Sequence, residues 1–451
     1  MMRHLPEQLA RAGLSAGEIE KKHLLFQRVE AALRATGPRP ELPQVYYVPG
    51  RIEVLGKHTD YAGGRSLLCA AERGFCMVAC PRKDSQIRIW DVGRGVQSEF
   101  PFAADLTPAD GHWSKYPMTV MRRVAQNFPS ARRGLDIAFA SDLPSAAGLS
   151  SSSALMIAIF LAVADANCLA ATDEYQQCIP NEDALAGYIS CVENGQSFGA
   201  LAGDRGVGTQ GGSEDHTAIL RCEPGYLSLY SFCPICFQQL LAWPKEYQFI
   251  VAATGVQAEK TGNAREAYNR AAATAWAVLD LWNSATGRGD KSLAMALTHS
   301  IGGAEEIRQV LRRKQHSRFS PQLLLDRFEQ FVDESAVLVP SVAAALERQD
   351  WKEMGGLVDR SQANAERWLG NQIPETMALA RGARSMGAVA ASAFGAGFGG
   401  SVWAMVAIQD AGEFLAEWAE RYRREFPVAA ERAQFFATRP GPAANRLFLV
   451  A

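Results

Sequence analysis

The sequence predicts an α+β fold made of two domains. Its 451 residues exceed what one hydrophobic core usually organises, and its composition, 48% hydrophobic and 21% charged, is typical of globular proteins. Helix-like and strand-like segments are mixed without the regular alternation that a doubly wound parallel sheet requires. We therefore expect an N-terminal helical extension over residues 1–40, followed by domains over residues 41–235 and 236–451.

The first half of the chain combines helical and strand signals. Leucines recur at helical spacing from residue 7 to residue 35, and the prolines at 38, 40 and 43 then break the helix. The apolar run from residue 154 to residue 166 lacks turn residues and is long enough to predict a buried helix. Strands are predicted at residues 45–48, 86–92 and 135–140, with a turn at Pro49 and Gly50.

The second half is richer in helix. Alanine and leucine recur at helical intervals, which predicts helices over residues 264–282, 293–314 and 321–348. Strands are expected at residues 249–253 and 401–408, the latter directly after a cluster of glycines.

Charge and hydropathy exclude several classes of partner. A formal net charge of -2 gives no reason to expect a nucleic-acid or membrane partner. Residues 1–6 lack the apolar core of a secretory signal, and the longest apolar run, residues 154–164, is about half of what spans a bilayer. We expect a soluble, cytoplasmic protein that works as a monomer or homodimer on small molecules.

Residues 143–154 place four consecutive serines, Ser150 to Ser153, at the start of the predicted buried helix. The first turn of a helix offers unpaired backbone N–H groups and a favourable dipole to an anion such as phosphate. A serine hydroxyl there can also coordinate magnesium, although the segment is not a Walker loop. The alternative is a well-capped core helix after a serine-rich loop.

Residues 49–64 are crowded with polar groups that can hydrogen-bond a polyol: Lys57, His58, Asp60 and Tyr61. Such a cluster is costly to bury unless a polar ligand or an internal network satisfies it. His58 as a structural hydrogen-bonding residue and Asp60 as a turn cap are the alternatives.

Two glycine-rich segments complete the set. Glycines at 395, 397, 399 and 400 allow the backbone to approach a ligand or another chain segment closely, although a tight turn would also explain them. Residues 208–216 place Asp215 beside a glycine turn, where its carboxylate can orient or deprotonate an attacking hydroxyl.

In their order and spacing, these segments resemble the GHMP kinases, and within them the galactokinase branch. The resemblance runs from about residue 45 to the end of the chain and implies a two-domain GHMP kinase fold with the active site in the interdomain cleft. It also implies ATP and Mg²⁺ as cofactors. The matching segments are residues 50–61 (sugar-binding signature), 144–154 (phosphate loop), 395–400 (C-terminal glycine motif) and 438–443 (branch-specific ending).

The resemblance implies a role for individual residues. Asp215 matches the catalytic aspartate and Arg51 the arginine that stabilises the transferring charge, while Ser152 and Glu193 match the magnesium ligands. The implied substrate contacts are Lys57, His58, Asp60 and Asn263, and the implied ATP contacts are Pro144, Gly148, Leu149, Ser150, Ser151, Ser152, Ser153 and Gly397.

The chain departs from the branch at several positions. Lys57 stands where the branch has a glutamate, Glu53 replaces an asparagine, and Asn263 falls where a sugar-contacting tyrosine is expected. The gap between Glu193 and Asp215 is also longer than usual. Lys57 therefore has two interpretations: it pairs with an anionic sugar, or it forms an internal ion pair with Glu53 or Asp60.

These observations predict a kinase that transfers the γ-phosphate of ATP to a sugar hydroxyl, in particular the anomeric one, without strict galactose specificity. A kinase of a non-sugar alcohol and a catalytically silent sensor of ATP and sugar are the alternatives.

Overall fold

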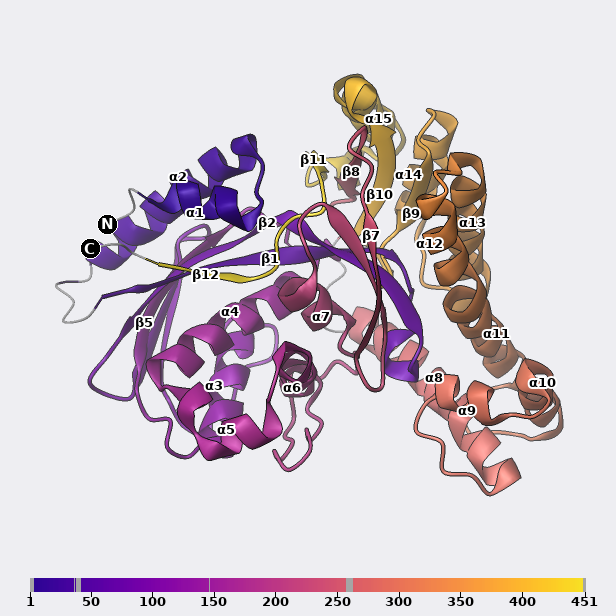
Figure 1. The fold of residues 1–451 in the computed structure, drawn as a ribbon, viewed down its shortest axis with the longest axis horizontal. Coiled ribbons are helices and arrows are strands. Elements are labelled where there is room, and N and C mark those ends of the chain that lie inside the picture. Colours follow the sequence, from indigo (N-terminus) through magenta and orange to yellow (C-terminus); the bar gives the residue numbers. More distant parts are fainter. Residues whose placement is uncertain (1–3, 36, 38–41, 146, 257–262, 449–451) are drawn as a thin grey trace.

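A computed structural model of the chain describes residues 4–35, 37, 42–145, 147–256 and 263–448. Its described residues form two β-sheets with helices packed against them, which confirms the predicted α+β class (Figure 1). Among the described residues, none of the helices is both long and apolar enough to cross a bilayer.

The larger sheet takes eight strands from the described residues, and its main path runs β12-β1-β2-β5-β3-β4. β6 pairs with β2 and β7, and β3 with β5 is a parallel pair in an otherwise antiparallel sheet. The bounds are β1 Gln44–Leu55, β2 Arg65–Pro81, β3 Gln86–Asp91, β4 Val96–Pro101, β5 Leu135–Ser141, β6 Tyr226–Ser231, β7 Cys236–Ala242 and β12 Asn445–Leu447.

The smaller sheet is antiparallel, with the order β11-β8-β10-β9 in the described part of the chain. Its strands are β8 Tyr247–Ala253, β9 Ala390–Ala393, β10 Ser401–Ala407 and β11 Gln434–Thr438.

The helices fall into an N-terminal pair, a group under the larger sheet and a long C-terminal series. The first two groups are α1 Leu5–Ala12, α2 Ala16–Arg34, α3 Lys115–Asn127, α4 Ser151–Ala166, α5 Asp173–Cys178, α6 Glu182–Asn194 and α7 Glu214–Arg221. The C-terminal series is α8 Asn263–Thr286, α9 Leu293–His299, α10 Gly303–Arg313, α11 Pro321–Val332, α12 Val339–Glu347, α13 Trp351–Asn364, α14 Pro374–Ser385, α15 Ala411–Glu425 and α16 Pro427–Ala430.

Alternating side chains of the larger sheet serve two different cores. Val45 and Tyr47 of β1 pack with α1 and α2, whereas Tyr46 and Val48 face the core that contains α3 and α4. Because successive residues of a strand point to opposite faces, the sheet is covered by helices on both sides (Figure 1). The smaller sheet alternates in the same way, with Ile250 and Ala252 against α14 and α15.

Several predicted elements are confirmed and others are redrawn. The strands at 86–92, 135–140 and 249–253 and the buried helix at 154–166 are present. Pro49 and Gly50 do not form a turn, since β1 continues through them with a register shift against β2. The helix predicted at 293–314 is interrupted between α9 and α10.

The N-terminal helical segment is two helices rather than one, broken at Gly13, whose φ of 106° favours glycine. Strands β7 and β12 lie beyond residue 235 but pair within the larger sheet. The division of the chain at residues 40 and 235 stays a prediction.

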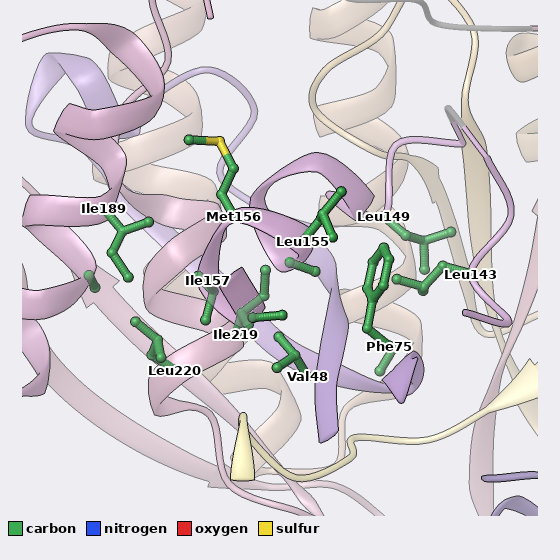
Figure 2. Close-up of a cluster of buried hydrophobic side chains, with 14 of the residues drawn as sticks. Val48, Phe75, Leu143, Leu149, Leu155, Met156, Ile157, Ile189, Ile219 and Leu220 are labelled. Carbon is green, nitrogen blue, oxygen red and sulfur yellow. The ribbon is translucent and has the colours of Figure 1, made fainter. Parts of the chain in front are cut away.

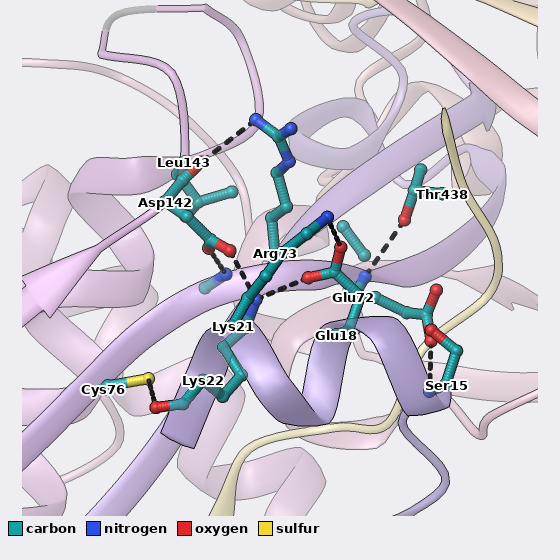
Figure 3. A network of polar contacts seen from close by, with 12 residues as sticks. Ser15, Glu18, Lys21, Lys22, Glu72, Arg73, Cys76, Asp142, Leu143 and Thr438 are labelled. Atoms are coloured by element: carbon teal, nitrogen blue, oxygen red, sulfur yellow. Dashed lines mark hydrogen bonds and ion pairs between the residues drawn. The ribbon is translucent and has the colours of Figure 1, made fainter. Parts of the chain in front are cut away.

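The helix α2 is tied to the chain just before the serine-rich segment. The Lys22 ammonium, whose side chain is fully buried, pairs with Asp142 and donates to Glu18 Oε2 at 2.8 Å (Figure 3). Asp142 Oδ1 also accepts from the Gly74 amide at 2.8 Å, and the Asp142 carbonyl accepts from Arg73 at 3.2 Å. The helical extension thereby fixes the residue from which the serine-rich loop departs.

We expect Lys22→Met to lower the free energy of unfolding by about 3–5 kcal/mol, because it removes one partner of a buried ion pair. Urea denaturation measures this change. Lys21→Met is the matched control, since Lys21 also bonds Glu18 but is 60% exposed, and its effect should stay below about 1 kcal/mol. Equal effects of the two substitutions would contradict the stabilising role of the buried Lys22 ion pair.

Candidate functional site

A cleft of about 840 Å³ collects most of the residues singled out from the sequence. Its walls come from β1, the loop before α4, the start of α7, the helix α8 and the loop between β9 and β10. Segments from both halves of the chain therefore meet in one concave site. The predicted residues that line it are Arg51, His58, Asp60, Gly148, Ser150, Ser151, Ser152, Glu193, Asp215 and Gly397.

The serine-rich loop is anchored by apolar residues on either side of it. Leu143 and Leu149 are buried in a cluster with Phe75 and Leu155 (Figure 2). On either side of Leu149 the backbone takes left-handed conformations, at Gly148 with φ 74° and at Ser150 with φ 58°. A non-glycine residue in that region is uncommon, and strain of this kind concentrates at functional sites.

The turn directs the first N–H groups of α4 toward the cleft. Residues Ser151 and Ser152 lie in the first helical turn, where backbone N–H groups have no carbonyl partner within the helix. This arrangement is suited to an anion such as a phosphate. The structure thus supports the phosphate-binding interpretation of this loop over a merely well-capped helix.

Arg51 is the charged centre of the site and is 4% exposed. Its Nε donates to Asp215 Oδ1 at 2.7 Å, and its Nη1 donates to the Gly148 carbonyl at 2.6 Å. Glu53 and Glu214 lie at 3.6 and 3.8 Å from its guanidinium nitrogens. Burial alone would lower the pKa of Arg51, but Asp215 and the two glutamates outweigh burial and raise it.

Three carboxyl groups near Arg51 have raised pKa values. Burial raises the pKa of Glu214 well above its ordinary value, and the neighbouring charges of Glu53 and Asp60 add to this. Burial also raises the pKa of Glu53, against the opposing effect of Arg51. The pKa of Asp60 rises to about 6, again chiefly through burial. At a pKa of about 6, Asp60 is largely ionised near neutral pH.

The turn that presents His58 is held from behind by α11 and the π-helical segment Asp333–Leu338 that follows it. Arg327 donates to the His58 carbonyl at 2.6 Å, and Gln330 donates to the Lys57 carbonyl at 2.9 Å. Glu334 accepts from the Gly56 amide at 2.9 Å. His58 itself has a left-handed φ of 57°. The helix α11 and the segment Asp333–Leu338 therefore stabilise a strained turn.

Tyr268 is a cleft residue that sequence reasoning missed. It lies on α8, and its ring centroid is 5.1 Å from that of His58. Asn263, the predicted substrate contact, begins α8, and its side chain lies outside the described part of the structure. The helical pattern predicted α8, and a tyrosine within that helix, five residues after Asn263, was the available signal.

Lys57 is not among the described residues that line the cleft. Its side chain is buried, and its Nζ donates to Ser361 Oγ on α13 at 2.9 Å. Ser361 in turn donates to the carboxylate of Glu334 at 2.8 and 3.0 Å. The Lys57 side chain points toward Ser361, and this direction does not support the predicted substrate contact. The internal interpretation fits better, although the partner is Ser361 rather than Glu53 or Asp60.

The predicted ATP residues divide into those that face the cleft and those that support them. Pro144 and Leu149 are buried and do not line the cleft in the described structure. Ser153 is also buried, and its hydroxyl donates to Glu193 Oε2 at 2.7 Å. Ser152, by contrast, lines the cleft.

The oxygen donors suit magnesium, which usually keeps several waters and takes one or two protein ligands plus substrate phosphates. Ser152 and Glu193 both line the cleft beside the start of α4. Within the described ranges, no group of three or more His, Cys, Asp or Glu forms a metal site, so an ion here would depend on the bound phosphates.

We expect Lys57→Met to lower the free energy of unfolding by about 1–3 kcal/mol, because it leaves buried polar groups without their donor. Urea denaturation tests the loss of stability, and a binding assay with neutral and anionic monosaccharides should show an unchanged order of affinity. Selective loss of binding to anionic sugars would instead place Lys57 against the substrate.

Three family models match successive parts of the chain. They are the galactokinase galactose-binding signature at residues 35–81, the GHMP kinase N-terminal domain at residues 115–187 and the GHMP kinase C-terminal region at residues 342–424. Each matched range contains residues that line the cleft or, for the C-terminal region, the glycine motif at residues 395–400. The chain belongs to the GHMP kinase family and carries the galactose-binding signature of galactokinases.

Curated relatives match over a limited stretch. The galactokinase of Actinobacillus pleuropneumoniae serotype 5b is 34% identical over 116 residues, or 26% of this chain and 30% of that protein. The galactokinase of Pasteurella multocida is 32% identical over 114 residues, or 25% of this chain and 30% of the relative. The alignments thus span about a third of the length of these relatives.

Solved structures extend the likeness in fold to nearly the whole chain. Lactococcus lactis galactokinase in complex with galactose superposes with a TM-score of 0.76 at 19% identity, covering 93% of this chain and 98% of that one. Methanococcus jannaschii mevalonate kinase reaches 0.54 at 13% identity, covering 89% and 99%. The fold is therefore that of the GHMP kinases, as predicted.

Proposed function

We propose that this protein is an ATP-dependent sugar kinase that transfers the γ-phosphate of ATP to a monosaccharide hydroxyl, in particular the anomeric one, which yields a sugar 1-phosphate. The observation that carries the proposal is the 2.7 Å contact between Asp215 and Arg51, a residue of the galactose-binding signature that also bonds the Gly148 carbonyl of the phosphate loop. The matched galactokinases support the choice of a sugar.

The two ends of the cleft suit the two substrates. Near the phosphate loop, His112 and Trp113 offer aromatic surface for the base of a nucleotide, and Arg94 donates to Ser145 within that loop at 2.8 Å. At the other end, His58, Asp60 and Tyr268 surround the space in front of Asp215. These polar groups suit the hydroxyls of a sugar.

The reaction follows from this arrangement. Asp215 accepts the proton of the sugar hydroxyl while its oxygen attacks the γ-phosphorus, and the bond from that phosphorus to the β,γ-bridging oxygen breaks to release ADP. Arg51 stabilises the negative charge that spreads over the transferring group. The N–H groups at the start of α4 hold the remaining phosphates.

Ser152 and Glu193 would hold Mg²⁺, which supplies charge neutralisation on the phosphate oxygens when bound. Ser153 orients the Glu193 carboxylate through its 2.7 Å hydrogen bond. Such outer hydrogen bonds fix the direction of a ligating carboxylate.

The Lys57 geometry makes neutral sugars better candidates than acidic ones. With Lys57 bonded to Ser361, the described wall around His58 and Asp60 presents carboxylates, and Arg51 is already paired with Asp215. A uronic acid or sugar phosphate would meet like charge at this end of the cleft. The absence of strict galactose specificity, the location in the cytoplasm and the state as monomer or homodimer remain predictions.

The test is ADP release from Mg-ATP with a panel of neutral, uronic and phosphorylated monosaccharides and of mevalonate-like and amino alcohols. Turnover with a neutral sugar is expected, and identification of the phosphorylated carbon by ³¹P NMR distinguishes the anomeric product. ATP binding without turnover across the panel would favour the silent sensor, whereas turnover with a non-sugar alcohol alone would favour the second alternative.

We expect Asp215→Asn to lower kcat by roughly 10²–10⁴-fold, the usual loss for a missing general base. The asparagine oxygen can still accept the hydrogen bond from Arg51, so ATP affinity measured by calorimetry should change little. Near-normal turnover would show that Asp215 only positions Arg51.

Removal of the proposed metal ligand should raise the Mg²⁺ concentration required for half-maximal activity. For Ser152→Ala and Ser153→Ala we expect an increase of roughly 10-fold or more, because one removes a ligand and the other the orientation of Glu193. Ser151→Ala is the matched control, since this neighbouring serine lines the same cleft without a proposed metal role. An identical Mg²⁺ requirement in all three variants would contradict the assignment.

A further inference from the structure

Glu53 is a buried carboxyl group that the proposed reaction does not use. It lies on β1, two residues from Arg51, and is 3% exposed. Its Oε2 lies 3.6 Å from Arg51 Nη2 and accepts a hydrogen bond from the Gly395 amide at 3.2 Å. Glu53 therefore touches the catalytic arginine and the C-terminal glycine motif, 342 residues away in the chain, at the same time.

Gly395 is a glycine because of Glu53. A Cβ atom at this position would lie 2.3–2.7 Å from the Glu53 carboxyl group, whose three atoms are its nearest neighbours. The φ of Gly395 lies outside the left-handed region that favours glycine, in contrast to Gly397. The missing side chain at 395 thus makes room for one particular carboxyl group rather than for a special backbone conformation.

The glycine motif is held on several sides. Asn371 donates to the Gly395 carbonyl at 2.7 Å and its own carbonyl accepts from the Phe398 amide at 2.6 Å. Ser401 donates to the Ala147 carbonyl of the phosphate loop at 2.6 Å. The hydrogen bond from the Gly395 amide to Glu53, described above, connects the motif to Arg51.

We propose that Glu53 is a positioning residue that docks the glycine motif onto Arg51, so that the C-terminal half completes the nucleotide end of the cleft only when the catalytic arginine is in place. Gly395 and Gly397 line the cleft, and Ser401, directly after the motif, bonds the Ala147 carbonyl of the phosphate loop. His58 and Asp60 also line the cleft and belong to the galactose-binding signature. Loss of the Glu53 contact with Gly395 therefore lowers kcat/KM for ATP and leaves the affinity for the sugar unchanged.

Glu214 supports this arrangement from the other side. It hydrogen-bonds to the Glu53 carboxylate and accepts from Ser66 Oγ at 2.6 Å. Glu53 is therefore held between Glu214, Arg51 and the Gly395 amide.

The first experiment compares Glu53→Ala with Glu53→Gln by steady-state kinetics. The alanine variant should lower kcat/KM for ATP by about 10²-fold, the loss expected from a misplacement of about 1 Å, with an unchanged KM for the sugar. The glutamine variant retains an oxygen that accepts from Gly395, so its KM for ATP should return close to the wild-type value. A purely structural role would instead reduce the active fraction and leave both KM values unchanged.

A double-mutant cycle isolates the contact itself. Gly395→Ala alone should impair ATP use severely, because its methyl group meets the Glu53 carboxylate. Glu53→Ala removes the obstacle, so the double variant should be no worse than Glu53→Ala alone. Gly397→Ala is the control, since its added Cβ meets Asn371 and its φ is 67°, and it should be equally harmful in both backgrounds.

The kinetic readout rests on the proposed function, but calorimetric affinity for Mg-ATP does not. If the wild-type protein binds ATP without turnover, the same cycle is measured on ATP affinity and separates the two proposals. Glu72→Gln, which alters an equally buried glutamate that bonds Ser15 and Arg439, controls for the loss of a buried charge. Additive effects of Glu53→Ala and Gly395→Ala, or an ATP affinity that Glu53→Ala does not change, would overturn the inference.

Discussion

The burial of Arg51 is the constraint on which the rest of the site depends. An isolated buried charge costs several kcal/mol, so a guanidinium that is 4% exposed needs partners in fixed places. The chain supplies Asp215 from α7, the Gly148 carbonyl from the phosphate loop and Glu53 from the same strand. Because each partner belongs to a different element, the strand, the loop and the helix must be correctly placed together. This aligns Asp215, the proposed general base, with the proposed phosphate-binding turn.

The same dependence extends across the molecule. The strained turn at His58 is held by Arg327 and by the neighbouring contact of Glu334 with Gly56. The helix α11 and the segment Asp333–Leu338 thus support the proposed sugar-binding turn without supplying the proposed reacting groups. At the opposite end, Lys22 holds Asp142 at the base of the phosphate loop. The two proposed substrate-binding segments are therefore each positioned by contacts from residues that do not line the cleft in the described structure.

The sequence predicted the fold class and the main cleft residues because their signals are local: a buried helix, strands, and clusters of glycine or serine beside polar groups. It could not predict side-chain directions that depend on tertiary packing. Lys57 turns toward Ser361, which is more than 300 residues away, and Ser153 rather than Ser152 bonds Glu193 because adjacent helical residues point about 100° apart. Tyr268 escaped because its contact with His58 depends on where α8 docks.

The pairing of β12 with β1 has a consequence for synthesis. Val45 lies opposite Leu447 in this pair, so the first strand of the larger sheet receives one of its two neighbours from a segment made some 400 residues later. On the ribosome, β1 is translated early but keeps one edge open until that segment emerges, and open strand edges are sites of aggregation. Because β1 also holds the buried Arg51, protection of this edge until β12 arrives would keep the strand available for the native sheet.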